Sequence, residues 1–341
     1  MTFLHGLRSG VLGAAIVAAS AHAEHFTFKD WEVACDNTRR CEAVGYQKEE
    51  AAEPVLLALT RAAGAMAPVE AVFSPYTDDD IKLGALTVRV GRTTMRGLHA
   101  DVALTPEQVG KLLPLLLNAE SAKVSDGKRV WVLSLAGVKA ALLKLDDLQG
   151  RVGTPTALAM RGNKPADAAL APLPAPQVQL LPAVATRAGD ARLLPAIVQG
   201  LPHGGCESAS DIADSERQNE LHRLSSGQVL LVLECNRGAY QSSFELWTAN
   251  DKAPYAAKRV RLPDAGGQQE AYVMNPAFDH GTLSSFSKGR GIADCNASAS
   301  WGWTAAGFQL IEASSGQLCR GMPGGYSLRE YTATVVRARA R

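Results

Sequence analysis

The sequence lacks an excess of charge of either sign. It contains 35 Lys and Arg residues against 34 Asp and Glu residues, and its formal net charge is +1. A protein that binds nucleic acid needs a strong positive field to neutralise phosphates, so this balance argues against nucleic acid as a partner. It also gives no sign of a strongly acidic or strongly basic substrate.

Long hydrophobic runs and short signatures of catalysis are also missing. Beyond residue 23 no apolar stretch approaches the ~20 residues of a membrane-spanning helix, so we expect no transmembrane anchor. There is no Gly-x-Ser-x-Gly elbow and no Cys-x-x-Cys pair. The Ser284-Ser285 and Asp279-His280 pairs are close in sequence, but such neighbours rarely converge into a catalytic set. We interpret them as ordinary polar residues and expect no cofactor and no metal.

What the sequence does contain begins with a secretory leader. Residues 1–23 have a basic residue, Arg8, an apolar run from Val11 to Ala19, and an Ala21-His22-Ala23 cleavage signature. We therefore predict a signal peptide and a periplasmic or secreted bacterial protein. Glu24 rather than cysteine follows the cleavage signature, which argues against a lipoprotein anchor.

Six cysteines follow the leader: Cys35, Cys41, Cys206, Cys235, Cys295 and Cys319. In an oxidising compartment such residues are expected to form disulfides. Sequence alone does not choose the connectivity, but chain order and proximity suggest Cys35–Cys41, Cys206–Cys235 and Cys295–Cys319. His203 and Cys206 would offer two metal ligands, yet the disulfide is the stronger interpretation of that cysteine.

A stretch rich in Pro and Ala divides the chain. Within residues 164–190, prolines interrupt every candidate helix or strand: Pro165, Pro172, Pro174, Pro176 and Pro182. This composition favours extended and partly stiff backbone, so we predict an interdomain linker. The domains would then comprise residues 24–163 and 191–341.

The first domain combines strand and helix patterns. Thr105, Pro106 and Gln108 form a helix start with a capping box, and Pro114 should kink or end that helix. Apolar residues then recur at helical spacing over 138–148. Strand patterns occupy residues 31–35, 55–60, 69–73, 86–90 and 130–135. We therefore predict an α+β fold for this domain.

The second domain is expected to be mainly antiparallel β, as a sandwich or a propeller-like array. A polar helix is expected over 207–224, followed by short strands separated by turns. Residues 299–304 and 308–312 are expected to form a hairpin, with Cys295 and Cys319 pinning its ends. The predicted class of the whole chain is thus α+β, with a disulfide-braced, mainly β second domain.

Two sets of motifs resemble known families. The pattern Trp31-x-Val33-x-Cys35, followed by Cys41 and the later strand–glycine–helix segment 135–145, resembles invasion-associated locus B-like secreted proteins. The runs 289–295, 301–303, 308–310 and 319–321 resemble the bacterial family called domain of unknown function 1176. The latter resemblance covers most of the mature chain. It implies an exported, disulfide-bearing envelope protein, and it implies no reaction and no functional residues.

Four residues are the candidate ligand-binding positions. Arg290 and Arg320 would lie close together if Cys295–Cys319 forms, and paired guanidinium groups suit a small anion. Trp301 and Trp303 lie two apart, hence on one sheet face, where aromatic rings stack on ligands or pack in a core. The expected partner is a small anionic ligand or another envelope protein.

Three functions remain open from the sequence. The favoured one is a non-enzymatic binding or interaction protein of the cell envelope, because export and disulfides are indicated and no catalytic set is convincing. The second is an envelope hydrolase whose site forms only in the fold. The third is an inhibitor-like or structural module acting on another secreted protein.

Reduction of the protein should lower its melting temperature substantially. Each disulfide is expected to contribute roughly 2–4 kcal/mol, and two of the three brace the second domain. Thermal unfolding with and without reductant measures the effect. Thiol titration of the unfolded, non-reduced protein should find no free thiol, and six free thiols would overturn the prediction.

Overall fold

The protein is mainly β. The computed structural model describes residues 24–77, 81–207 and 212–337, so the predicted signal peptide lies outside the described residues. Within this range 41% of residues form strands and 13% form helices, with 3 α-helices. The predicted α+β class is therefore wrong.

The fold contains more strand than expected, and much of the excess lies in strands that the local sequence pattern did not indicate. They are β3 (Cys41–Tyr46), β7 (Thr93–Leu98), β8 (Ser121–Ser125) and β11 (Glu220–Arg223). The first three lack a run of β-branched and aromatic residues, and β11 lies within the segment that was expected to be helical. Strands β3 and β8 are interior to their sheets, so hydrogen bonding from both sides stabilises them despite modest propensity.

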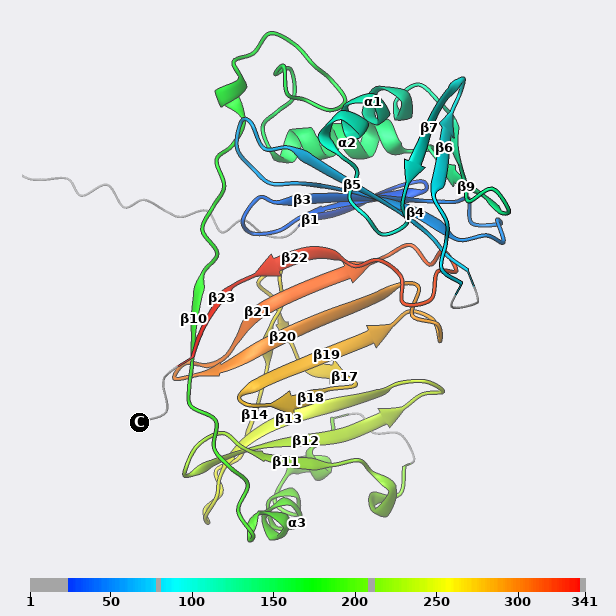
Figure 1. The fold of residues 1–341 in the computed structure, drawn as a ribbon. Helices are drawn as coiled ribbons and strands as arrows, with labels where there is room; N and C mark the ends of the chain where they lie inside the picture. Colours follow the sequence, from blue (N-terminus) through cyan, green and yellow to red (C-terminus); the bar gives the residue numbers. More distant parts are fainter. Residues whose placement is uncertain (1–23, 78–80, 208–211, 338–341) are drawn as a thin grey trace, which may run out of the picture.

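The N-terminal sheet is antiparallel, in the order β1-β2-β3-β4-β5. Its other strands are β1 (Glu24–Phe28), β2 (Trp31–Cys35), β4 (Val55–Arg61) and β5 (Val69–Pro75). The helices α1 (Pro106–Leu116) and α2 (Val138–Leu148) cover one face (Figure 1). Side chains alternate across a strand, so Trp31 and Val33 join the core on this face while Ala34 joins a separate core on the other.

The capping box at the start of α1 is confirmed. The Thr105 hydroxyl accepts the backbone N–H of Gln108 at 3.3 Å, and the Gln108 side chain accepts the backbone N–H of Thr105 at 2.8 Å. Pro114 lies inside the helix, which ends at Leu116. The sequence therefore located this helix and its end closely.

A second N-terminal sheet has the order β7-β6-β8-β9. It is completed by β6 (Leu86–Val90) and β9 (Val130–Ser134). Its inner face packs into the same core as the helices, through side chains that include Val88, Val124 and Trp131. Its outer face contains exposed residues on three of these strands.

Two larger sheets form the C-terminal half. The first has the order β11-β12-β13-β14 with β17 added to β13, and the second has the order β18-β19-β20-β21-β22. The predicted hairpin is confirmed as β20 and β21. The new strands are β12 (Gln228–Arg237), β13 (Ser242–Asn250), β14 (Lys258–Arg259), β17 (Tyr272–Met274), β18 (Ala277–Asp279), β19 (Thr282–Lys288), β20 (Asn296–Thr304), β21 (Gly307–Gly316) and β22 (Leu328–Thr332).

Smaller elements complete this half. The short strands β15 (Leu262–Pro263) and β16 (Gln269–Glu270) pair with each other, and the helix α3 (Leu193–Val198) covers one end (Figure 1). Short 3-10 turns occur at Ala166–Ala168, Asp190–Arg192, Pro202–Gly205 and Asp214–Glu216.

The Pro- and Ala-rich segment runs along one side of the molecule (Figure 1). Part of it forms β10 (Gln177–Leu180), which pairs in parallel with β23 (Thr334–Arg337). Val178 and Leu180 are buried there. The connector is therefore attached to the last strand, and the proposed division of the chain at residues 164–190 stays a prediction.

The N-terminal sheet lies directly on the C-terminal half. Strand β22 passes beside β2 and β3 (Figure 1). A shared core joins Val44, Tyr46 and Leu56 of the first sheet to Met322 and Leu328. The first sheet is therefore covered on both faces, which explains why every residue of β2 and β3 is buried.

The three disulfides join Cys35 to Cys41, Cys206 to Cys235, and Cys295 to Cys319. These are the pairs that chain order suggested. The third one connects the start of β20 to the segment after β21, so it closes the hairpin at its open end. Because Arg320 directly follows Cys319, the disulfide also restricts the position of Arg320.

Substitution of Gly45 by Ala should destabilise the fold by about 1–3 kcal/mol. An added Cβ would lie 2.1 Å from the Trp31 indole, which is fully buried and donates to the carbonyl of Ser134. Chemical denaturation measures the effect.

Gly110→Ala is the matched control. Gly110 lies in α1 with open space around it, so the same methyl group should be neutral or stabilise by up to about 1 kcal/mol. Equal stability of the two variants would contradict the proposed packing of Trp31.

Candidate functional site

The four predicted ligand-binding residues occupy β20 and the segments flanking the hairpin. Arg290 precedes β20, Trp301 and Trp303 lie on it, and Arg320 follows β21. Their environments differ sharply, because each guanidinium and each indole has its own neighbours. The four do not line one common cavity among those found in the described chain.

Arg290 is engaged by a buried carboxylate. Its guanidinium donates to both carboxylate oxygens of Asp294, whose side chain is fully buried. Asp294 also accepts the backbone N–H of Gly321 at 2.6 Å. Burial alone would raise the pKa of Asp294, but these hydrogen bonds and the Arg290 charge outweigh it and lower the pKa. This carboxylate thus links Arg290 to the residue that follows Arg320.

Arg320 is buried and only partly satisfied. Its side chain is 6% exposed, and Nη2 donates to Asp30 Oδ1 at 2.8 Å and to the carbonyl of Lys29 at 3.2 Å. The Nε and Nη1 atoms are buried without a hydrogen-bond partner. Nη1 lies 3.8 Å from Glu49 Oε2, and the Glu49 side chain is 83% exposed.

Arg320 lines an open cleft of about 760 Å³. The turn between β1 and β2 and the segment after β3 supply the rest of the lining, which is Lys29, Asp30, Lys48, Glu49 and Glu50. Three cationic and three anionic side chains therefore surround the cleft. Among these six residues, Arg320 is the one with buried nitrogens that lack a hydrogen-bond partner.

The two tryptophans lie along the same strand in different cavities. Trp301 is 4% exposed, donates from Nε1 to the carbonyl of Pro263 at 2.7 Å, and lines a cavity of about 430 Å³. Trp303 packs against Phe308 with ring centroids 4.9 Å apart and lines a second cavity of about 460 Å³. Its Nε1 atom is buried without a hydrogen-bond partner.

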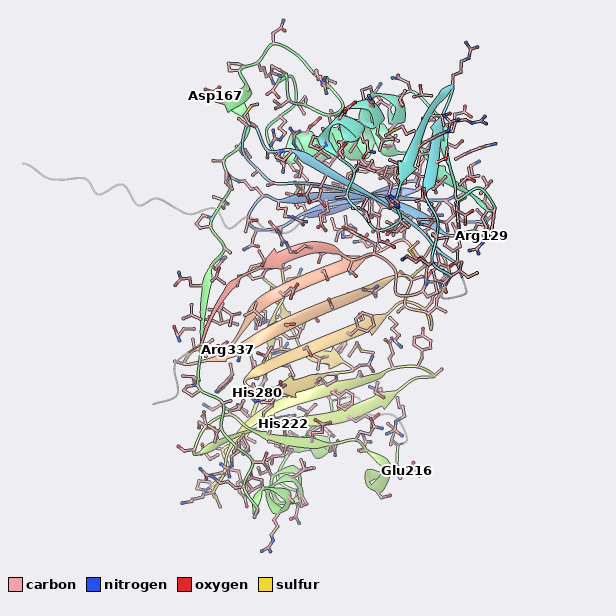
Figure 2. All side chains as sticks on the ribbon, viewed as in Figure 1. Arg129, Asp167, Glu216, His222, His280 and Arg337 are labelled. Carbon is pink, nitrogen blue, oxygen red and sulfur yellow. A yellow bond between two sulfur atoms is a disulfide. The ribbon has the colours of Figure 1, made fainter. Side chains whose placement is uncertain are left out.

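Two histidines from different segments of the chain also line the second cavity. His222 of β11 and His280, which follows β18, both line it, and Figure 2 shows them near each other. Each is bonded to an acid close in sequence, His222 to Glu220 at 2.7 Å and His280 to Asp279. The His280 side chain is 71% exposed, so it is not a preorganised base.

The serines near His280 are used by the backbone instead. Ser284 donates to the carbonyl of Ala277 at 3.3 Å, and Ser285 donates to the carbonyl of Met274 at 2.9 Å. A nucleophile would need its hydroxyl bonded to a base. The described structure therefore does not assemble these groups into a catalytic set.

Sequence reasoning missed a buried charged cluster between the two halves of the protein. His25 of β1 binds Glu32 of β2 through Nε2 at 2.8 Å and Glu330 of β22 through Nδ1 at 2.9 Å. Ser315 of β21 lies 3.1 Å from the same Nδ1. Glu32 is fully buried and also accepts the backbone N–H groups of residues 317 and 318. The local sequence gave no sign of it, because Ser315 and Glu330 lie 290 and 305 residues from His25 in the chain.

The serine, histidine and glutamate of this cluster are not arranged as a catalytic triad, because the Ser315 hydroxyl donates to Glu330. Burial lowers the pKa of His25, but hydrogen bonds and charges from Glu32 and Glu330 outweigh burial and raise it to about 9. His25 therefore keeps its proton and cannot accept one from Ser315. The cluster binds the two halves together instead.

A second buried cluster stabilises the segment after α2. Arg151 is fully buried and donates to the carbonyls of Ala62, Gly64 and Ala65. Asp146 accepts the backbone N–H groups of residues 158 and 159 at 2.7 and 2.8 Å. Both charged side chains are hydrogen-bonded to backbone groups of the protein and are therefore not available to a ligand.

Metal binding finds little support in the described chain. The one grouping of suitable ligand types there is Asp294, Cys295 and Cys319, and its two cysteines form a disulfide. Cys206 is likewise bonded to Cys235, so it cannot pair with His203 as a thiolate ligand. Nor is any described helix long and apolar enough to span a membrane.

Comparison with known proteins assigns the chain to a family. The family model described as "Protein of unknown function (DUF1176)" matches residues 25–335. The chain belongs to the DUF1176 family. The resemblance of its N-terminal half to invasion-associated locus B-like proteins is not shown by the comparisons.

One relative of this DUF1176 chain is described only as uncharacterized. The chain is 26% identical over 344 residues to the "Uncharacterized protein YpfG" of Escherichia coli (strain K12). The match covers 86% of this chain and 88% of the relative. No solved structure matches. The chemistry of a DUF1176 site must therefore be argued from its own residues.

The His25 cluster should make stability fall at alkaline pH. The unfolded histidine loses its proton near pH 6.5, whereas the folded one keeps it until about 9. The contribution of protonated His25 to the free energy of unfolding is therefore complete below about pH 6.5, declines as pH rises and is lost above about pH 9. A pKa shift of this size corresponds to about 3 kcal/mol in the free energy of unfolding. Denaturation at a series of pH values measures it.

His25→Gln should flatten this decline and also lower stability at neutral pH, because Glu32 would remain buried without a cation. His99→Gln, at an exposed position, is the control and should follow the parent profile. If His25→Gln retained the parent's alkaline decline, the cluster would not be its source.

Proposed function

We propose that this protein is an exported, non-enzymatic binding protein of the bacterial cell envelope, and that it takes a small anion in the cleft beside Arg320. Three disulfides among the described residues and the absence there of a membrane-spanning helix are consistent with export. The proposed location is the periplasm.

The observation that supports an anion is the state of the Arg320 guanidinium. Two of its three nitrogens are buried without a hydrogen-bond partner, although the side chain lines an open cleft. A buried polar group left unpaired is costly, and a charged group more so. A carboxylate or phosphate that took the place of Glu49 beside Nη1 would satisfy that nitrogen through a charge-assisted hydrogen bond, which is stronger than a neutral one.

Glu49 indicates how such an anion would enter. Its carboxylate already lies 3.8 Å from Nη1, beyond hydrogen-bond distance, on a side chain that is largely exposed. A ligand carboxylate or phosphate would replace it with little cost in packing. Lys29 and Lys48, on the same cleft, would add positive charge once Glu49 turns away.

Binding is favoured over hydrolysis by the state of the acid–base groups. The buried histidine is protonated, and the candidate serines are hydrogen-bonded to backbone carbonyls. The cleft beside Arg320 contains charged groups that can hold an anion and contains no serine, cysteine or histidine to attack one.

Glu49→Gln should strengthen anion binding by about fivefold. The substitution removes a competing carboxylate, and an exposed ion pair of this kind is worth up to about 1 kcal/mol. Isothermal titration with inorganic phosphate and with citrate measures the affinity. Glu216→Gln, on an exposed residue that does not line the cleft, changes the net charge equally and should have no effect. Figure 2 shows Glu216 at the end of the molecule formed by the C-terminal sheets.

Lys48→Gln and Arg320→Gln should both weaken binding. Lys48 is exposed, so its loss should not disturb folding, whereas Arg320→Gln is interpreted only if the variant remains folded by circular dichroism. If neither anion binds the parent or Glu49→Gln, or if Lys48→Gln leaves the affinity unchanged, the proposed cleft is wrong.

A further inference from the structure

The outer face of the sheet β7-β6-β8-β9 has an unusual pairing of like charges. Arg89 of β6 and Lys123 of β8 are direct partners in the antiparallel register, and both side chains are exposed. Directly opposed residues lie on the same sheet face, and like charges in that position destabilise a sheet. Folding alone therefore gives no reason for this pair.

More positive charge surrounds the pair. Arg96 of β7 is exposed, Arg92 lies in the turn between β6 and β7, and Lys128 and Arg129 lie in the turn between β8 and β9. Figure 2 shows Arg129 at that end of the sheet. We call these six residues the basic face: Arg89, Arg92, Arg96, Lys123, Lys128 and Arg129.

The basic face forms no ion pair within the described chain, although the charge of Arg129 acts on the neighbouring Asp126 and helps to lower the pKa of that carboxyl. None of its six members forms an ion pair with a described carboxylate. Asp126, in the turn between β8 and β9, accepts the backbone N–H groups of Lys128 and Arg129 at 2.9 and 2.7 Å. Its carboxylate thus shapes the turn and does not reach the cations in the middle of the sheet.

Two exposed valines lie on the same face. Val132 is the register partner of Lys123 and Val130 is the register partner of Ser125, so both point outward from the edge strand β9. They are 42% and 53% exposed, respectively. The outer surface therefore combines spread positive charge with an apolar rim.

We propose that the basic face docks on an anionic phospholipid surface. Each Lys or Arg near such a surface contributes favourably through the phosphate headgroups, and exposed apolar side chains add contact with the acyl boundary. A protein partner fits less well, because protein interfaces are depleted in Lys and usually need a buried aromatic anchor. The outward positions named here contain no aromatic residue.

The test uses the full mature protein and vesicles. Flotation is compared between vesicles of phosphatidylcholine alone and vesicles that also contain phosphatidylglycerol. The parent should bind only the anionic vesicles, and added salt should release it. The double variant Arg89→Gln, Lys123→Gln should bind about thirtyfold more weakly, from the usual contribution of two cations near a charged bilayer.

The same double variant should be at least as heat-stable as the parent, because it removes a like-charge pair. Loss of binding therefore cannot be attributed to unfolding. Lys252→Gln, Lys258→Gln is the control, since both are exposed lysines elsewhere and the net charge changes equally. It should bind like the parent.

Three results would overturn the proposal. The first is failure of the parent to bind anionic vesicles, including the case in which it instead binds an acidic protein. The second is equal binding to neutral vesicles. The third is equal loss of binding in the Lys252/Lys258 control. None of these depends on Arg320, so they are separate from the test of the anion cleft.

Discussion

The buried carboxylate of Glu32 constrains the arrangement of the two halves more than any other group. It points away from the helix-covered face of its sheet, and it is fully buried where that sheet meets the C-terminal half. A buried charge needs a partner. The partners are His25 and the backbone of residues 317 and 318, and His25 in turn binds Glu330. The N-terminal strands and the β21–β22 region therefore have to dock in one register, since breaking such a pair costs about 3–5 kcal/mol.

A second set of contacts along the same junction follows from the first disulfide. Cys35–Cys41 closes the turn between β2 and β3, and Asp36 within that turn bonds the Arg329 guanidinium at 2.6 Å. Asn37 exchanges two hydrogen bonds with the backbone of Thr332. Because the disulfide closes the turn, it restricts the backbone that carries these side chains. The junction thus combines these polar contacts with an apolar cluster that includes Tyr46 and Leu328.

The sequence predicted features that depend on near neighbours and missed those that depend on distant ones. The capping box, the β20–β21 hairpin and the disulfide pairs were predicted correctly, because each rests on residues that are close in the chain. The fold class was wrong, because β3 and β8 have weak local propensity and are stabilised by strands on both sides. At the candidate sites, the sequence drew attention to Arg320 but not to Glu49, Lys29 or Lys48, which approach it only when β22 docks beside β2 and β3. The partners of His25 on β21 and β22 are likewise distant from it in the sequence.

The nearly neutral net charge of the chain does not by itself indicate which partners the protein binds. The chain's charges nearly cancel in total, yet they are distributed unevenly: acidic groups are buried at the junction, while the cations Arg89 and Lys123 at the centre of the basic face are exposed. A nearly neutral protein has little long-range field, and beyond about 10 Å salt screens what remains. Recognition at the Arg320 cleft or at the basic face therefore depends on short-range contact with a phosphate or carboxylate. The fold determines where each cation lies and therefore which contacts it can make. A count of charges along the chain gives no information about these positions.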